Sequence, residues 1–205
     1  MSLKAVVFDM DGTLVDAKEW HYLALNEALS IFGEEISQVE HADFFDGLPT
    51  KVKLNALSKQ NRLPPHLHDI VSAVKQERTF RYISSNLFPS VRQLLMMQWI
   101  KAQGLRIAVA TNSIRPTAME MLNRAGLIGF LDVLVTNEDV TNPKPDPEMY
   151  QVTCDALGVS PDETIVFEDN EFGVESARGA GCAVHKIELV SDLDTSLVSK
   201  IVGGD

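Results

Sequence analysis

The chain has 205 residues, of which 45% are hydrophobic, and its 18 basic and 29 acidic side chains give a net charge of −11. The acidic excess argues against nucleic-acid and anionic-membrane partners, because lysine and arginine bind such phosphate-rich surfaces. No apolar run reaches the ~20 residues that span a bilayer, and residues 1–4 lead directly into a strand-like run, which argues against a signal peptide. Two cysteines are too few for a disulfide framework. We therefore expect a cytoplasmic globular protein with one domain, or one core plus a smaller appendage.

Five short apolar runs predict the strands of a buried parallel sheet, at 5–8, 106–110, 132–135, 164–167 and, more weakly, 183–187. Helices are expected after the later runs. One covers 116–125, where a proline starts the helix and a glycine follows it. Another has Asp146 as N-cap and ends before Gly158, and a third covers 171–180. This alternation predicts an α/β fold with a doubly wound, mainly parallel sheet.

The segment between the first two predicted strands, residues 16–88, contains no strand-like run. It opens with an apolar stripe at helical spacing, and two more helices are expected around 52–57 and 70–74. The stripe consists of Trp20, Leu23, Ala24, Ala28, Ile31 and Phe32. A block of ~70 residues is too long for a plain connection in such a sheet. We therefore expect an α/β core formed by 1–15 plus 89–205, with 16–88 as an inserted helical domain.

Polar side chains gather at the carboxyl ends of the predicted strands. In an open parallel sheet these ends converge on one crevice, where ligands bind. The crevice would hold carboxylates, a hydroxyl, an amide and an amine, from Asp9, Asp11, Thr111, Asn112, Lys144, Glu168 and Asp169. Carboxylates ~4 Å apart repel by about 4 kcal/mol at an effective dielectric of 20, so the group needs a cation or large pKa shifts. Oxygen ligands without paired histidine or cysteine favour Mg²⁺.

A divalent cation, a lysine and a hydroxyl are groups that stabilise a transferring phosphoryl group. In this crevice Asp9 can act as a nucleophile that forms an acyl phosphate, and Asp11 can protonate the leaving oxygen and then activate water. Gly12 allows a sharp turn after them. The ordinary alternatives are a polar strand end for the two aspartates, a helix cap for Thr111 and a solvated loop for Lys144. The combination at one sheet edge favours phosphate chemistry.

Four segments resemble, in order and spacing, the motifs of the haloacid dehalogenase-like hydrolases: Asp9-Met-Asp-Gly-Thr-Leu14, the strand end at Thr111, Lys144 between prolines, and Glu168-Asp169. The long insert is similar to that family's small helical cap. The β-phosphoglucomutase-like phosphatases are the branch that the chain resembles most. The resemblance covers nearly the whole chain and implies a Rossmann-like core with an inserted helical cap domain.

The resemblance also implies roles for individual residues. Asp9 would be the nucleophile and Asp11 the general acid and base. Asp9, the backbone carbonyl of Asp11 and Asp169 would hold Mg²⁺, and Glu168 would support the metal site directly, through water, or only as part of the structure. The residues expected to hold the phosphoryl group are Thr111 and Lys144, with Asn112 beside them.

Three further residues are candidates for substrate contact: His21, Gly47 and Arg115. His21 matches a histidine that faces the active site in the mutase branch, although it could be structural, and Arg115 could reach a substrate anion or solvent. Gly47 lies in the loop that resembles the cap's specificity loop. In the mutase a lysine precedes this glycine and an arginine follows three residues later, whereas this chain has Asp46 and Thr50. The differences favour a phosphatase over a mutase.

We therefore expect a Mg²⁺-dependent phosphomonoesterase that acts on a small phosphorylated metabolite, such as a sugar phosphate, through an aspartyl-phosphate. The alternatives are a sugar phosphomutase and a non-catalytic phosphoacceptor module. The cap would close over the crevice through hinges near 14–16 and 85–89 and exclude water. The expected partner is the small substrate alone, without nucleic acid or membrane, and the expected assembly is a monomer or a weak dimer.

Overall fold

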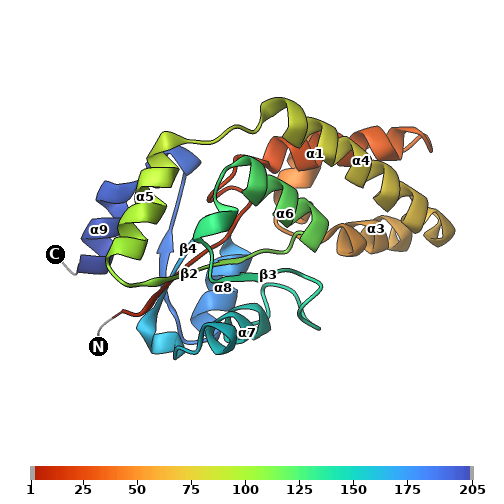
Figure 1. The fold of residues 1–205 in the computed structure, drawn as a ribbon. Helices are drawn as coiled ribbons and strands as arrows, with labels where there is room; N and C mark the ends of the chain where they lie inside the picture. Colours follow the sequence, from red (N-terminus) through yellow and green to blue (C-terminus); the bar gives the residue numbers. More distant parts are fainter. Residues whose placement is uncertain (1–2, 204–205) are drawn as a thin grey trace. The chain divides into compact units, whose positions relative to one another are not determined.

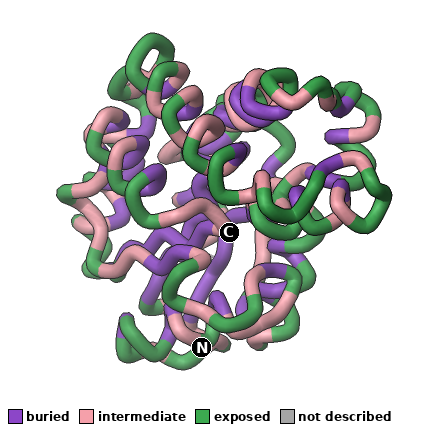
Figure 2. The backbone as a smooth tube through the Cα atoms, turned by 90° about the vertical axis from the view of Figure 1, so that its right-hand side faces the viewer, coloured by how far each residue is buried: buried purple, intermediate pink, exposed green. Residues whose placement is uncertain are grey.

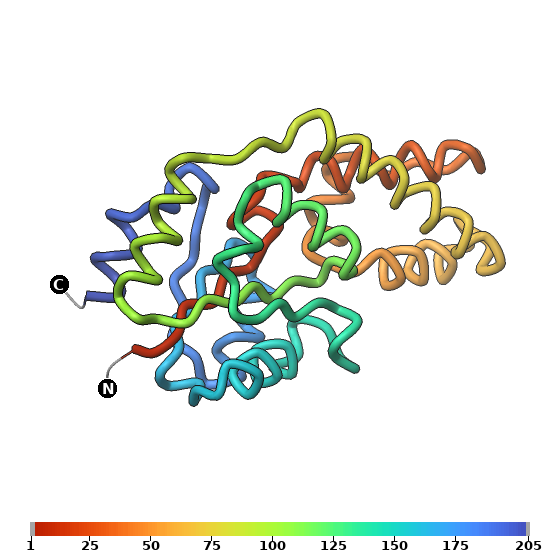
Figure 3. The backbone as a smooth tube through the Cα atoms, in the orientation of Figure 1, coloured from red at the N-terminus to blue at the C-terminus, as the bar shows by residue number. Residues whose placement is uncertain are grey.

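A computed structural model describes residues 3–203, which divide into two compact units. The core unit consists of residues 3–16 and 88–203, and the helical unit is Ala17–Leu87. Figure 3 traces the chain from the first strand into the helical unit and back into the core unit. Among the described residues, no helix is long and apolar enough to cross a membrane.

The core unit contains a parallel sheet, which within residues 3–203 has the strand order β3-β2-β1-β4-β5 (Figure 1). Its strands are β1 (Ala5–Phe8), β2 (Arg106–Ala110), β3 (Val133–Val135), β4 (Thr164–Glu168) and β5 (Ala183–Lys186). The chain builds β2 and β3 on one side of β1, then β4 and β5 on the other, so the strand order reverses at β1. Phe8 pairs with both Val109 and Phe167, and the three central strands therefore end within one residue of one another. The predicted doubly wound α/β fold is confirmed.

The central strands are buried on both faces (Figure 2). β1 and β4 are buried at every residue, and β2 at every residue except Arg106. The rings of Phe8 and Phe167 stack across β1 and β4 with centroids 5.3 Å apart. Because these strands are buried on both faces, their sequences are nearly continuous apolar runs. The fourth strand extends one residue beyond its predicted end, so Glu168 is carried within it.

Helices cover both faces of the sheet (Figure 1). On one face α5 (Val91–Ala102) packs against α9 (Thr195–Gly203), and on the other α7 (Glu148–Leu157) packs against α8 (Glu171–Gly179). The remaining helical segments of this unit are α6 (Arg115–Arg124), η3 (Ile128–Phe130), η4 (Pro161–Glu163) and η5 (Val190–Asp192). The α7 and α8 face matters for the site, because both helices begin at the carboxyl edge of the sheet.

Local signals set the ends of these two helices. α7 begins at Glu148 with Pro147, not the predicted Asp146, as its N-cap residue; the Asp146 side chain accepts a 3.0 Å hydrogen bond from the Glu148 backbone N–H just before the helix. Gly158 ends α7 in the left-handed conformation, with φ 66°. Asn170 caps α8 by accepting a 2.9 Å bond from the Phe172 N–H.

The helical unit contains no strand within Ala17–Leu87. Its elements are α1 (Lys18–Ser30), α2 (Gln38–Glu40), the π-helical turn η1 (His41–Phe45), α3 (Thr50–Lys59), the 3₁₀ turn η2 (Pro65–Leu67) and α4 (His68–Asn86). α1 packs along α4, and a core of its own includes Leu25, Leu29, Leu54, Leu57 and Val71. The unit therefore has its own hydrophobic cluster.

The predicted apolar stripe of α1 was wrong in part. Leu25 and Leu29 are fully buried, whereas Ile31 is 57% exposed. α1 ends at Ser30, so Ile31 lies beyond the helix and does not continue its buried face. Val52 and Ile70, which were expected to mark helix cores, are also exposed. Several positions satisfied the helical spacing, and packing in the cluster with α3 and α4 selected the face.

Candidate active site

The loop after β1 carries two aspartates. The Asp9 N–H donates a 2.9 Å hydrogen bond to the Phe167 carbonyl, so Asp9 continues the pairing with β4 for one residue beyond the strand. The chain then turns at Gly12, whose φ of 95° is disfavoured for residues with a side chain. The Gly12 N–H donates to the Val15 carbonyl at 2.7 Å and closes the loop. Asp9 and Asp11 are thereby placed at the reversal point of the sheet.

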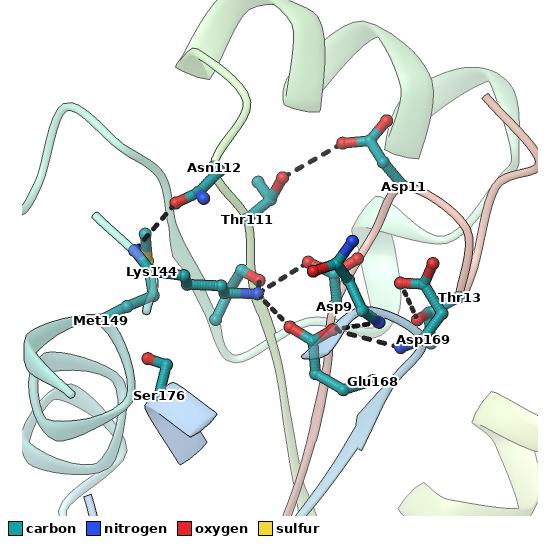
Figure 4. A network of polar contacts seen from close by, with 12 residues as sticks. Asp9, Asp11, Thr13, Thr111, Asn112, Lys144, Met149, Glu168, Asp169 and Ser176 are labelled. Carbon is teal, nitrogen blue, oxygen red and sulfur yellow. Dashed lines mark hydrogen bonds and ion pairs between the residues drawn. The ribbon is translucent and has the colours of Figure 1, made fainter. Parts of the chain in front are cut away.

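Lys144 joins the ends of three strands (Figure 4). Its ammonium donates to Asp9 Oδ1 at 2.7 Å, to the Ala110 carbonyl at 2.9 Å and to Glu168 Oε1 at 2.5 Å. The three acceptors use all three ammonium donors. Only 4% of Lys144 is exposed. The loop lysine is therefore a buried component of the site and not a solvated side chain.

Glu168 is 1% exposed and is bonded on both oxygens. Oε1 accepts from Lys144 and from the hydroxyl of Tyr150, the latter at 2.7 Å. Oε2 accepts from the backbone N–H groups of Asp169 and Asn170 at 3.1 and 3.3 Å. These bonds hold the carboxylate in one orientation between α7 and the start of α8.

The buried charges of the site shift each other's pKa values. Burial raises the pKa of Asp9 well above its usual range; the charge of Glu168 adds to this effect, and Lys144 opposes it. Burial alone would lower the pKa of Lys144, but Asp9 and Glu168 outweigh burial and raise it. The pKa of the Tyr150 hydroxyl is raised by burial and by the neighbouring Glu168. Lys144 therefore stays charged, and additional positive charge would favour ionised carboxylates here.

Three carboxylates form a group that fits a divalent cation. Oxygens of Asp9, Glu168 and Asp169 all lie within 4.8 Å of one another. The donor set contains only oxygen, which suits Mg²⁺ better than a softer ion. The hydroxyl of Thr13 donates to Asp169 Oδ1 at 3.4 Å and orients that side chain. The residues present fit Mg²⁺.

Asp11 has different surroundings from Asp9. Its Oδ2 accepts hydrogen bonds from the Thr111 and Ser113 hydroxyls at 3.3 and 2.8 Å. The Ser113 backbone N–H donates to Thr111 Oγ1 at 3.0 Å, which holds the Thr111 hydroxyl beside Ser113. Asp11 is partly exposed and does not belong to the three-carboxylate group. One loop thus presents two carboxylates in unlike environments.

The structure brings most of the predicted residues together. Asn112 joins the site through Oδ1, which accepts a 3.2 Å bond from the Lys144 backbone N–H. Arg115 does not join the Lys144 network: it is exposed, and its guanidinium pairs with Asp139 at 2.5 Å. His21 and Gly47 lie in the helical unit. His21 Nδ1 is 3.3 Å from Lys75 Nζ, and Gly47 follows η1 with φ 73°.

The sequence analysis assigned no role to four residues that shape this site: Thr13, Ser113, Tyr150 and Gly173. Tyr150 offered a signal, because a tyrosine on the buried face of a helix needs a partner for its hydroxyl. Gly173 lies opposite Glu168, and a Cβ atom at this position would overlap with the carboxylate. Nothing local in the sequence marks that approach.

Comparison with known proteins connects this geometry to a family. A family model described as haloacid dehalogenase-like hydrolase matches residues 6–187. The phosphorylated carbohydrates phosphatase of Thermotoga maritima is 32% identical over 182 residues, which cover 87% of this chain and 82% of that protein. The fructose-1-phosphate phosphatase YqaB of Escherichia coli is 31% identical over 189 residues, covering 90% and 96%.

A solved structure agrees with these relatives. The crystal structure of CbbY from Rhodobacter sphaeroides in complex with phosphate has a TM-score of 0.80 and 25% identity, and the match covers 90% of this chain and 87% of that one. The resemblance of the four sequence motifs is thereby confirmed over most of the chain. The chain belongs to the haloacid dehalogenase-like hydrolases, and it is an enzyme of that family.

Proposed function

We propose that this hydrolase is a Mg²⁺-dependent phosphomonoesterase that acts through an aspartyl-phosphate on Asp9. The contrast between Asp9 and Asp11 carries the proposal. Asp9 is buried against Lys144 within the three-carboxylate group, whereas two hydroxyls hold the partly exposed Asp11. Two carboxylates in unlike environments are suited to two different roles, a nucleophile and a proton donor.

Each residue has a defined part in the proposed reaction. The Asp9 carboxylate attacks phosphorus, and Asp11 donates a proton to the leaving oxygen as the ester bond breaks. Asp11 then takes a proton from water, which attacks the acyl phosphate and regenerates Asp9. Thr111 and Ser113 keep the Asp11 carboxylate oriented through both steps. Lys144 supplies positive charge beside the nucleophile.

Asp9, Asp169 and the backbone carbonyl of Asp11 would hold Mg²⁺, which when bound offsets the charges of carboxylates and phosphoryl oxygens. Glu168 is better placed to support the metal site without binding the ion, because each of its two oxygens already accepts two hydrogen bonds. In this arrangement Glu168 positions Lys144 beside Asp9, and the metal ligands are the other carboxylates.

We propose a sugar phosphate or similar hydroxyl-rich ester as the substrate. Two relatives above 30% identity are named for phosphorylated carbohydrates and for fructose 1-phosphate. In the helical unit, Asp46 precedes Gly47 in the loop expected to select the substrate, and Asp46 pairs with Lys18 at 3.5 Å. A carboxylate there favours hydroxyl groups over a second phosphate, which supports a phosphatase.

A mutase remains the second candidate, because the putative β-phosphoglucomutase of Thermotoga maritima matches 98% of this chain at 26% identity and a TM-score of 0.70. The two activities differ in product. A phosphatase releases inorganic phosphate, whereas a mutase converts an aldose 1-phosphate to the 6-phosphate and depends on a bisphosphate primer.

The test is a panel of sugar, glycolyl, glyceryl and nucleotide phosphates with Mg²⁺ or with EDTA, followed by measurement of released phosphate. We expect turnover only with Mg²⁺, loss of turnover in Asp9→Asn, and normal turnover in the control Asp162→Asn, an exposed residue of η4. Turnover in EDTA, or full activity of Asp9→Asn, would overturn the proposal. Primer-dependent isomerisation without phosphate release would favour the mutase.

A further inference from the structure

The two cysteines of the chain lie side by side in the core unit. Cys154 is in the last two turns of α7, and Cys182 lies in the turn between α8 and β5. Their Sγ atoms are 3.8 Å apart. Both residues are buried and belong to one hydrophobic cluster that also contains Tyr150 and Val166. Residues 28 positions apart in the sequence thus form a thiol pair.

Several features make this pair suited to oxidation. A disulfide needs an S–S distance of about 2.05 Å, so the sulfurs have to approach each other by less than about 2 Å. Cys182 follows Gly181, whose φ is 92°, and lies outside any helix, where a small backbone shift is less costly than within α7. The thiol of Cys182 hydrogen-bonds to Cys154 and lowers the pKa of Cys154, which favours the thiolate.

We propose that Cys154 and Cys182 form a modification site, at which a hydroperoxide closes the two thiols into an intramolecular disulfide that ties α7 to the start of β5. The proposal needs no second chain. From the sequence, two cysteines were too few for a disulfide framework, and their pairing is a property of the tertiary structure alone.

The reaction balances in two steps with hydrogen peroxide. The Cys154 thiolate attacks one peroxide oxygen, the O–O bond breaks, and the departing hydroxide takes a proton and leaves as water; Cys154 becomes a sulfenic acid. The Cys182 sulfur then attacks the Cys154 sulfur. The S–O bond breaks, and the hydroxide leaves as water with the Cys182 proton. Two thiols are oxidised, and one peroxide is reduced to two water molecules.

Closure has a consequence at the active site, and this part rests on the proposed function. Tyr150 lies one turn before Cys154 on α7, and its hydroxyl donates a 2.7 Å hydrogen bond to Glu168. Although Cys182 shifts more easily, the new bond also pulls on Cys154 and so on that turn of α7, and hydrogen bonds weaken when the donor is displaced. We infer that the oxidised protein turns over substrate more slowly.

The test treats the folded, full-length protein with hydrogen peroxide and then measures its intact mass, its thiol count and its migration without reductant. We expect a loss of about 2 Da, no remaining thiols and a monomeric band, all reversed by dithiothreitol. Cys182→Ser is the matched control. It cannot form the disulfide, and it should instead yield a sulfenic acid that dimedone traps. Cys154→Ala serves as a second variant should Cys182→Ser fold poorly.

Each other outcome overturns a part of the proposal. A disulfide-linked dimer, a gain of oxygen atoms in the wild-type protein, or oxidation only in urea would reject the intramolecular site. Phosphate release from p-nitrophenyl phosphate should fall at least 3-fold on oxidation, recover with dithiothreitol, and stay constant in Cys154→Ala. A closed disulfide with unchanged turnover would reject the link to Tyr150. If no form of the protein has turnover, the proposed function fails, whereas the mass measurement still decides the thiol site.

Discussion

Gly173 leaves the space that the Glu168 carboxylate occupies. A Cβ atom built on Gly173 would overlap with the carboxylate carbon and both oxygens of Glu168. Gly173 lies in the first turn of α8, which returns directly over the end of β4. Hydrogen bonds therefore fix the Glu168 carboxylate, which positions Lys144. The carboxylate also packs directly against the backbone of α8 at Gly173, where there is no side chain.

Gly173→Ala should impair catalysis more than folding. Alanine is favoured over glycine within a helix by up to about 1 kcal/mol, but its methyl group would displace Glu168 and with it Lys144. We expect kcat/KM for a phosphate ester to fall about 10–100-fold, together with a lower Tm, because the buried pair of Glu168 with Lys144 is disturbed. Gly129→Ala is the control, because a Cβ there meets nothing within 4 Å. Equal activity of both variants would show that Glu168 tolerates displacement.

Lys144→Met should destabilise the core unit. The substitution leaves Asp9 and Glu168 buried without the cation that they share. Removing one partner of a buried ion pair costs about 3–5 kcal/mol. We expect a loss of this size in urea unfolding with EDTA, and a smaller loss with Mg²⁺, because a ligand bound only by the folded state stabilises it.

The control for Lys144→Met is Lys101→Met, which breaks a half-exposed pair with Asp132 at 2.6 Å. Exposed pairs contribute about 0–1 kcal/mol, so this variant should unfold almost like the wild type. A loss of similar size in both variants would contradict the role of Lys144 as the buried counter-charge.

Tyr150→Phe keeps the buried ring and removes one hydrogen bond to Glu168. A bond to a charged acceptor contributes about 1.5–3 kcal/mol, so we expect a loss of this order in the free energy of unfolding. The Mg²⁺ concentration for half-maximal turnover should rise several-fold, because Glu168 loses a restraint. Tyr82→Phe, which removes a tyrosine–glutamate bond to Glu27 in the helical unit, should leave the Mg²⁺ dependence unchanged.

His41 should make the stability of the helical unit depend on pH. It is 6% exposed, and burial together with the nearby Lys53 lowers its pKa from 6.5 to about 4. Between these values the unfolded chain binds a proton that the folded unit does not bind. The contribution of His41 to the free energy of unfolding is therefore fully present above pH 6.5. It falls as the pH drops toward 4, by at most about 3 kcal/mol.

The measurement for His41 uses the Trp99→Phe background, which leaves Trp20 of α1 as the fluorescent reporter of the helical unit. Urea unfolding at pH 7.0 and 4.5 should differ more in this background than in the same protein with His41→Gln, which does not titrate. An identical pH response in both proteins would contradict a buried neutral histidine.

The strands were predictable because their signal is local. Strands 5–8 and 106–110 begin and end where the apolar runs do, since a strand buried on both faces needs an apolar side chain at nearly every position. The convergence of Asp9 with Lys144 was predictable for a related reason: the carboxyl ends of parallel strands meet at one edge, whatever the details of packing. The buried face of α1 was not predictable, because several residues have the right spacing and only packing with α3 and α4 selects Leu25 and Leu29.

The sequence by itself thus determined the α/β class and predicted which charged groups gather at the carboxyl edge of the sheet, because these depend on periodicity and on the order of motifs. Tertiary structure decided which groups touch. Tyr150 contacts Glu168, Ser113 contacts Asp11, and Cys154 lies against Cys182. Such contacts join residues from different elements, and their distances depend on how helices pack against the sheet. An interaction that acts over a few ångströms is therefore fixed only when the whole core has formed.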